Sequence, residues 1–246
     1  MTTPRIARLV TAGALFVFVA AFAHEATAAP SCIDPRATGR MLLSDLRGLA
    51  TTQFVPLGLG LGAAALVHPL DDNADAWVDA HGPSHLTKVG RLGGAWQTQV
   101  PLAAALVADS LIERCARPLN IDLIRALGVN LAVTNTLKFA TQRERPNHES
   151  ARLSFPSGHV SSTFALATVL QERAGWKAGA AAYGFATYTA WTRVRDDKHW
   201  ISDTVFGGAL GIAVGRAVVR TGRMNRWMVM PSASRSGVGV SVTRTP

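Results

Sequence analysis

The sequence predicts an all-α protein, a helical bundle of about six core helices that follows an N-terminal signal segment. Six apolar segments, rich in Ala, Leu and Val, alternate with short polar turns, and most are longer than ordinary strands. Composition agrees, since 48% of the residues are hydrophobic and 17% are charged, against about 25% charged in an average domain. We place the six helices near residues 54–68, 99–113, 122–140, 159–172, 178–193 and 203–220.

The chain of 246 residues is long enough for one domain with a substantial core. We expect a signal peptide over residues 1–28, an N-terminal extension over 29–50, the helical domain over 51–222 and a C-terminal tail over 223–246. Within the tail, residues 237–243 alternate in the manner of a short strand.

Residues 1–28 have the three parts of a secretory signal. Two arginines form a basic start, residues 9–22 form an apolar stretch, and Ala26-Thr27-Ala28 is a small-residue cleavage site. We therefore expect export, with the mature chain beginning near Ala29. The alternative is an uncleaved membrane anchor, although the apolar stretch is shorter than the ~20 residues that a bilayer span needs.

The six apolar segments could cross a membrane or form a bundle outside it. A 15-residue helix rises only about 22 Å against a hydrocarbon core of about 30 Å, and polar residues such as Asp109, Glu113, Asn130 and Asn135 are costly against lipid. A cleaved signal and six spans also conflict with the positive-inside rule. We expect an exported, periplasmic or envelope-associated bundle. An integral inner-membrane protein with an extracytoplasmic active site is the alternative.

The formal net charge of +9 favours anionic partners, either phosphorylated small molecules or lipid head groups. Nucleic acid is not expected, because the chain has neither a basic stripe with interleaved aromatics nor a zinc-finger spacing. Cys32 and Cys115 both lie in the exported part, where a disulfide is permitted. Two buried free thiols are equally compatible with the sequence.

The last apolar segment carries Gly207, Gly211 and Gly215 at four-residue spacing. This spacing places the glycines along one helix face, where the backbone of another helix can approach closely. If glycine were merely tolerated there, each would cost about 1 kcal/mol relative to Ala. We therefore expect a close helix contact along this face.

Three blocks of residues carry the candidate chemistry. Residues 138–146 (Lys-Phe-Ala-Thr-Gln-Arg-Glu-Arg-Pro) end the third segment, residues 155–159 (Phe-Pro-Ser-Gly-His) open the fourth, and residues 192–203 bridge the fifth and sixth. Transfer of a phosphoryl group needs positive charge around its oxygens more than it needs covalent chemistry. The candidate substrate-binding residues are Lys138, Arg145, Ser157, Gly158 and Arg193.

The start of the fourth segment and the pair at the start of the sixth have further roles. Ser157 and Gly158 open a helix whose unpaired amides can bind an anion, although an ordinary helix cap explains the same residues. His199 and Asp203 are four residues apart, which on one helical turn brings a carboxylate to an imidazole nitrogen. The carboxylate would fix the tautomer and leave the opposite nitrogen able to attack phosphorus.

The three blocks resemble the motifs of the type 2 phosphatidic acid phosphatase (PAP2) and vanadium haloperoxidase superfamily, which are Lys-x6-Arg-Pro, Pro-Ser-Gly-His and Ser-Arg-x5-His-x3-Asp. Every fixed position is matched except one, where Thr192 replaces the usual Ser and keeps the hydroxyl. The resemblance implies a PAP2-like phosphatase domain over residues 51–222. It assigns His199 as the nucleophile, Asp203 as its orienting partner and His159 as the general acid and then base.

We expect hydrolysis of phosphate monoesters, lipid phosphates or isoprenoid pyrophosphates through a phosphohistidine intermediate. No metal or other cofactor is expected, and vanadate should inhibit. The expected partners are the phosphorylated substrate and a membrane surface in peripheral contact. One alternative is a vanadium-dependent haloperoxidase, although those enzymes are usually much longer. The other is a non-enzymatic envelope phospholipid-binding protein, against which the intact set of basic and histidine residues argues.

Other polar residues fit a site less well. The spacing of His81 and His85 suits metal ligands on a helix, but Gly82-Pro83 between them favours a turn. The acidic run that starts at Asp71 resembles a calcium loop without its glycine or terminal Glu, and we interpret it as a solvated acidic turn. Three basic residues could meet a second charge on the substrate, although exposed cations are the simpler interpretation: Arg143, Arg195 and Lys198.

Overall fold

The computed structural model describes residues 35–81, 96–112, 118–148, 152–224, 227–234 and 237–244. Within these ranges the chain forms eight α-helices, one short 3-10 helix and two strands, which confirms the predicted all-α bundle. The helices are α2 (Pro35–Thr52), α3 (Phe54–Val67), α4 (Asp71–His81), α6 (Trp96–Ile112), α7 (Pro118–Thr141), α8 (Gly158–Ala174), α9 (Trp176–Arg195) and α10 (Ile201–Met224), with η1 (His68–Leu70) between α3 and α4.

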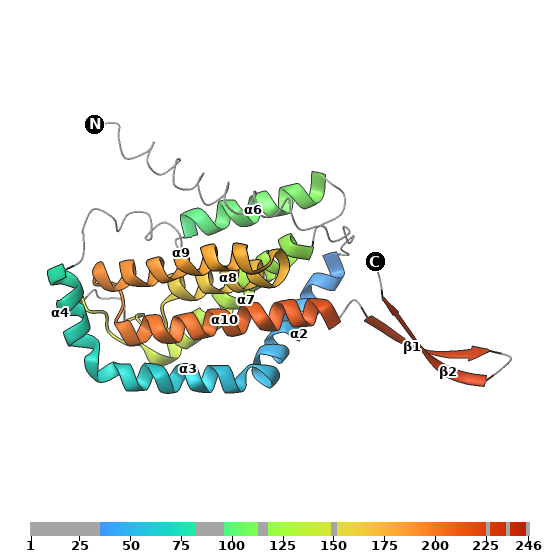
Figure 1. The fold of residues 1–246 in the computed structure, drawn as a ribbon, viewed down its shortest axis with the longest axis horizontal. Coiled ribbons are helices and arrows are strands. Elements are labelled where there is room, and N and C mark those ends of the chain that lie inside the picture. Colours follow the sequence, from blue (N-terminus) through green and yellow to red (C-terminus); the bar gives the residue numbers. More distant parts are fainter. Residues whose placement is uncertain are drawn as a thin grey trace.

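Helices α8 and α10 form the centre of the bundle (Figure 1). Helix α8 packs against α7, α9 and α10, while α10 also contacts α2 and α3. Because α8 is covered on several sides, most of its residues are buried, including its serines and threonines. The fully buried side chains of the core include Leu119, Leu123, Val129, Val169, Leu210 and Val214.

The glycine strip of α10 lies directly against α8, as its spacing predicts. A Cβ added at Gly211 would stand 2.3 Å from the Ser161 carbonyl oxygen, and one at Gly215 would stand 2.6 Å from Thr168 Cβ. Atoms do not approach this closely without a shift of the backbone. The two helices therefore pack at a separation that only glycine permits at these positions.

All six predicted segments are helical, and the structure has two further helices that were not predicted from the sequence. Helix α2 lies in the expected polar extension, where Leu42 and Leu49 pack against the core. Helix α4 begins at Asp71, within the run that we expected to be a turn. Five of the six helices are also longer than the apolar segments that predicted them, and the longest three, α7, α9 and α10, have 24, 20 and 24 residues. These three helices are therefore longer than expected, because polar residues extend each apolar segment.

A buried ionic cluster joins α2, α7 and α8 at the end of the bundle where α7 begins. Arg125 donates from Nε to Asp45 at 2.9 Å and from Nη1 to Asp122 at 2.9 Å. Arg173 donates from Nε to the other oxygen of Asp122 at 2.8 Å. Each buried charge thus has a partner of opposite sign, which burial requires.

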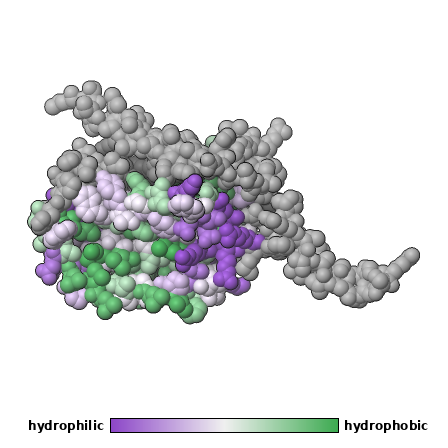
Figure 2. All heavy atoms as spheres, viewed as in Figure 1, coloured by the Kyte–Doolittle hydropathy of each residue, from purple (hydrophilic) through white to green (hydrophobic). Residues whose placement is uncertain are grey.

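The outer face of α3 is apolar and exposed. Leu59 and Leu66 are 71% and 81% exposed, while only Gly60 and Ala64 of this helix are buried, against α10. Figure 2 shows hydrophobic residues gathered along the edge of the molecule where α3 lies. Two helical stretches in the described ranges are long and apolar enough to cross a membrane, Phe54–Ala74 and Ile201–Arg223, of which the second is mostly buried in the bundle.

The tail ends in an antiparallel hairpin of β1 (Trp227–Ser234) and β2 (Gly237–Arg244), paired from Trp227 with Arg244 to Ser234 with Gly237. The strand expected over residues 237–243 is confirmed. Figure 1 shows this hairpin beyond the end of α10. The predictions on the signal peptide, the cleavage near Ala29 and the two cysteines fall outside the described residues.

We expect Gly211→Ala to lower the free energy of unfolding by ~1–3 kcal/mol, since the added methyl group must push α8 and α10 apart. Gly184→Ala on α9 is the matched control, because a methyl group at this position would meet nothing within 4 Å. The control should be neutral or stabilising by up to about 1 kcal/mol. Denaturant unfolding followed by circular dichroism measures both, and equal effects for the two variants would contradict the close contact.

Candidate active site

The candidate residues from all three blocks meet at one end of the bundle, where α7 and α9 end and α8 and α10 begin. Lys138 lies in the last turn of α7 and Arg193 in the last turn of α9. His159 is the second residue of α8, and Asp203 lies in the first turn of α10. The connection over residues 142–157 joins α7 to α8 at this end, and the shorter connection over residues 196–200 joins α9 to α10 there.

A tight turn between α9 and α10 positions His199. The backbone N–H groups of Lys198 and His199 both donate to the carbonyl oxygen of Arg193, at 3.1 and 3.3 Å. Asp197, with φ of 53°, takes the left-handed conformation that this reversal needs. His199 is thereby held beside the end of α9, and its side chain is buried.

The start of α8 presents a hydroxyl group and backbone amides to the site. Ser157 stands at the N-cap position, but its side chain makes no capping hydrogen bond. Its Oγ is buried and has no hydrogen-bond partner among the described residues. A Cβ added at Gly158 would touch Thr134 at 3.4 Å and Lys138 Cε at 3.8 Å. The geometry therefore suits an anion better than it suits an ordinary cap.

Lys138 points its ammonium group toward the loop before α8. Its Nζ donates to the carbonyl oxygens of Leu153 at 2.5 Å and Ser154 at 3.2 Å. Burial, together with the positive charge of Arg145, lowers the pKa of Lys138 to about 8, although Asp203 opposes the shift. The ammonium group is charged at neutral pH and loses its proton in mild alkali.

The two histidines lie in a strongly positive environment. Burial makes the largest contribution to a pKa of about 3 for His159, and the positive charges of Arg193, His199, Lys138 and Arg145 lower this pKa in the same direction. A bound phosphate dianion would offset those charges and so raise the pKa of His159. The site can therefore take up a proton on this imidazole together with an anionic ligand.

His199 is neutral for similar reasons. Burial lowers its pKa to about 4, Asp203 opposes this shift, and Lys138 and Arg145 act in the same direction as burial. A neutral imidazole keeps a lone pair on one nitrogen, as a nucleophile must. Its Nδ1 lies 3.8 Å from Asp203 Oδ2, somewhat beyond hydrogen-bond distance, so Nε2 is the nitrogen that faces away from the carboxylate.

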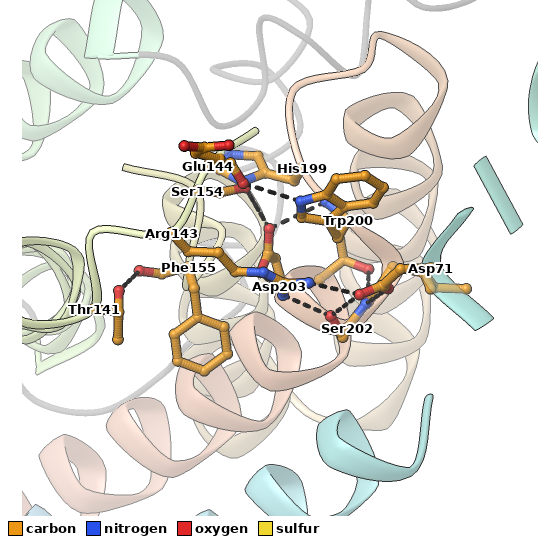
Figure 3. Close-up of polar contacts among 12 residues, drawn as sticks. Asp71, Thr141, Arg143, Glu144, Ser154, Phe155, His199, Trp200, Ser202 and Asp203 are labelled. Atoms are coloured by element: carbon orange, nitrogen blue, oxygen red, sulfur yellow. Dashed lines mark hydrogen bonds and ion pairs between the residues drawn. The ribbon is translucent and has the colours of Figure 1, made fainter. Parts of the chain in front are cut away.

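Asp203 is held by several hydrogen-bond donors (Figure 3). Its Oδ2 accepts from the Ser154 hydroxyl at 2.5 Å and from the Trp200 backbone N–H at 3.1 Å. Its Oδ1 accepts from Arg143 Nη1 at 2.6 Å. The carboxylate is fully buried, and these bonds leave it little freedom to turn.

Arg193 and its neighbour Thr192 make polar contacts within α9 and the turn that follows it. Arg193 Nη2 donates to Asp196 at 2.6 Å. Thr192, the one departure from the family pattern, is buried and donates its hydroxyl to the Thr189 carbonyl oxygen at 2.8 Å. The hydroxyl at this position therefore serves the helix, which explains why Thr can replace Ser here.

Two predictions about neighbouring residues were wrong. Arg143 is neither an exposed cation nor turned to a substrate, because it binds the buried Asp203 and Asp71. Asp71 is not in a solvated turn, since it is 5% exposed and begins α4. Sequence reasoning also missed Ser154 and Ser202, which lie outside the fixed positions of the motifs and contact the acidic residues only through the fold. Within the described ranges no group of three or more His, Cys, Asp or Glu side chains could hold a metal ion.

A family model described as the PAP2 superfamily matches residues 120–227. This match covers less than half of the chain. All eight candidate site residues lie within the matched range: Lys138, Arg145, Ser157, Gly158, His159, Arg193, His199 and Asp203.

The chain is also similar to one relative and to two solved structures. A lipid A 1-phosphatase of Porphyromonas gingivalis is 38% identical over 96 residues, which are 37% of this chain and 21% of that protein. The match thus spans about a fifth of the relative's length. Two solved structures share the fold at 21% identity. The first transmembrane PAP2 type phosphatidylglycerolphosphate phosphatase from Bacillus subtilis has a TM-score of 0.57 over 68% of this chain and 93% of its own. Aquifex aeolicus LpxE has a TM-score of 0.51 over 61% of this chain and 95% of its own.

We expect the affinity for orthovanadate or phosphate to fall as the pH rises through about 8, because Lys138 loses its charge there. The sign follows from the lowered pKa, since the charged form is complete below it. Equilibrium binding from pH 6 to 10 measures the effect. Lys138→Arg should abolish this alkaline loss while keeping affinity at pH 7, and an unchanged alkaline limb in that variant would assign the loss to another group.

Proposed function

We propose that the protein is a phosphoric ester hydrolase that acts on lipid phosphates through a phosphohistidine intermediate. The observation that carries this proposal is the meeting of the buried His199 and the partly buried His159 with three cations at a helix start. The cations would hold a phosphoryl group, while His199 remains neutral and able to attack it. The lipid A 1-phosphatase relative favours a lipid phosphate over a soluble monoester or an isoprenoid pyrophosphate.

The reaction would have two steps. Lys138, Arg145 and Arg193, with the Ser157 hydroxyl and the amides at the start of α8, would bind the phosphoryl oxygens. Nε2 of His199 then forms a bond to phosphorus as the bond to the leaving alcohol oxygen breaks, and His159 donates its proton to that oxygen.

In the second step water replaces the histidine. Neutral His159 takes a proton from water, the water oxygen bonds to phosphorus, and the bond between phosphorus and His199 breaks. His159 is then protonated again, as in the substrate complex, and it loses this proton to solvent when inorganic phosphate leaves the site. Asp203 stabilises the positive charge that His199 carries in the intermediate.

The charge for this chemistry comes from side chains, so we infer that no metal takes part. Three basic residues surround the histidines, and they supply the positive potential that a metal ion supplies in other phosphatases. Vanadate would occupy the same site as an inhibitor. The haloperoxidase alternative would need bromide oxidation by the vanadate-loaded protein with peroxide.

We infer that the protein is exported and remains at the envelope membrane, held there by α3. The signal segment over residues 1–28 supports export. The exposed apolar side chains of α3 support lipid contact, because a face of this kind is unfavourable in water. A lipid substrate would then be present in the surface that the enzyme occupies.

Hydrolysis of a lipid phosphate in detergent with excess chelator tests the function. Wild-type protein should release phosphate, and His199→Ala should abolish both turnover and any acid-labile phosphoprotein trapped by quenching. His159→Ala should lose ~10²- to 10⁴-fold on an alkyl phosphate and far less on an activated aryl phosphate, whose leaving group needs little protonation.

Both variants should still bind vanadate, which separates a chemical defect from unfolding. Phosphate trapped on His159 would reverse the two roles. Activity that disappears with chelator and returns with Mg²⁺ would overturn the metal-independent mechanism while leaving the phosphatase proposal standing.

Vesicle flotation tests the membrane contact. Wild-type protein should float with vesicles of phosphatidylglycerol and phosphatidylethanolamine at high salt, since the apolar α3 face does not depend on charge. A double Leu59→Gln and Leu66→Gln variant should float much less, whereas the control Leu131→Gln on α7, which is 63% exposed, should change little. Wild-type protein that stays at the bottom of the gradient would contradict lipid contact.

A further inference from the structure

Arg143 joins two buried carboxylates that lie far apart in the sequence. Its Nη1 donates to Asp203 at 2.6 Å and its Nη2 donates to Asp71 at 2.7 Å. The guanidinium also lies over the Trp200 ring, with its central carbon 5.7 Å from the ring centroid. Figure 3 shows Arg143 lying between the two acidic residues. None of these contacts uses a residue of the family motifs except Asp203.

Asp71 also accepts hydrogen bonds from Ser202, at the start of α10. Its Oδ1 accepts from the backbone N–H of Ser202 at 2.9 Å, and its Oδ2 accepts from the Ser202 hydroxyl at 2.7 Å. Ser202 is the second residue of α10, whose backbone N–H has no partner within its own helix. Asp71 therefore caps the start of α10 from α4, and it holds the turn of helix that carries Asp203.

The contacts run from the negative Asp71 to the positive Arg143 and on to the negative Asp203. Asp203 in turn lies beside the imidazole of His199. We propose that Arg143 and Asp71 are positioning residues of the phosphatase reaction, which set the orientation and effective charge of Asp203 and through it the state of His199. This inference rests on the proposed function. It assigns two residues outside the motifs to the catalytic step, although neither touches the substrate.

Arg143 has a definite task in this arrangement. Without Arg143, Oδ1 of Asp203 would lose its charged hydrogen-bond donor. The site is buried, and an unpaired carboxylate is costly there. The carboxylate could then rotate and draw the imidazole away from the phosphoryl group. The hydrogen bond from Arg143 thus fixes the carboxylate at one oxygen and leaves the other directed to His199.

The charges around His199 come from every neighbouring element. Lys138 lies on α7, Arg145 follows it, His159 lies on α8, Arg193 lies on α9 and Asp203 lies on α10. Arg143 and Asp71 lie behind Asp203, so each can be changed without touching the phosphate-binding cations. Loss of the positive Arg143 should make His199 easier to protonate, and loss of the negative Asp71 should make it harder.

The experiment compares pH profiles of kcat/KM for wild type, Arg143→Gln, Asp71→Asn and the double variant. Arg143→Gln should move the acid limb to higher pH by at least ~0.5 unit, Asp71→Asn should move it to lower pH by a smaller amount, and the double variant should lie between. Each single variant should lose ~10- to 100-fold in kcat with little change in KM.

The design separates charge from structure. Asp71→Asn keeps an oxygen for the Ser202 N–H, so α10 should stay capped while the charge is lost. Arg143→Lys keeps the charge but loses the planar fork, so it should restore the acid limb and only part of kcat. Arg152→Gln is the control, because it removes an exposed arginine that pairs with Glu144 at 3.1 Å, and it should leave both kcat and the profile unchanged.

The outcomes are distinct. If wild type hydrolyses no phosphate ester, the proposed function fails. If wild type is active but Arg143→Gln keeps its kcat, or if both single variants move the acid limb in the same direction, the positioning role is overturned. Vanadate binding and cooperative unfolding identify any variant that does not fold. If Arg143→Gln does not fold, the position of the acid limb in Arg143→Lys tests the positioning role by itself.

Discussion

The contact between α8 and α10 is the constraint on which the rest of the structure depends. Gly207 and Gly211 let the two backbones meet so closely that a methyl group would stand 3.0 Å or less from a carbonyl oxygen at the start of α8. The same contact continues to the helix starts, where the Ser157 N–H donates to the Asp203 carbonyl oxygen at 3.2 Å. The start of α8 and the start of α10, which carries Asp203, therefore cannot move independently. Rigid elements of this kind can hold a reactive geometry that loops could not.

Burial sets the protonation states in the site. Both histidines are neutral without an anion, because burial and surrounding cations oppose their charged forms. Two of the cations lie beside oxygen atoms, Lys138 beside carbonyl groups of the loop before α8 and Arg193 beside the Asp196 carboxylate. A ligand with two negative charges would change the balance more than any other group that could enter. Binding of such a ligand and proton uptake would therefore be parts of one event in this site.

The sequence predicted the helices that are apolar throughout and the residues that form recognisable motifs. It also predicted the closeness of α8 and α10, because a row of glycines along one helix face is costly unless another helix packs against it. It could not predict α2 or α4, whose polar residues hide the apolar ones that pack. Asp71 was misread for a physical reason, since its value as a helix cap depends on Ser202, a residue 131 positions away. Arg143 was misread in the same way, because only the fold gives it two carboxylates.

The ionic cluster around Arg125 has a consequence for how the molecule can vary. Lys138 follows Arg125 by 13 positions on α7, which is about 20 Å along a helix. Charges at that separation are largely screened from each other. The bundle thus has two charged ends that act separately, one that holds helices together and one that we propose binds phosphate. Substitutions at the Arg125 end can alter thermal stability without changing the electrostatics of the candidate site. Stability and reactivity can therefore evolve independently in this chain.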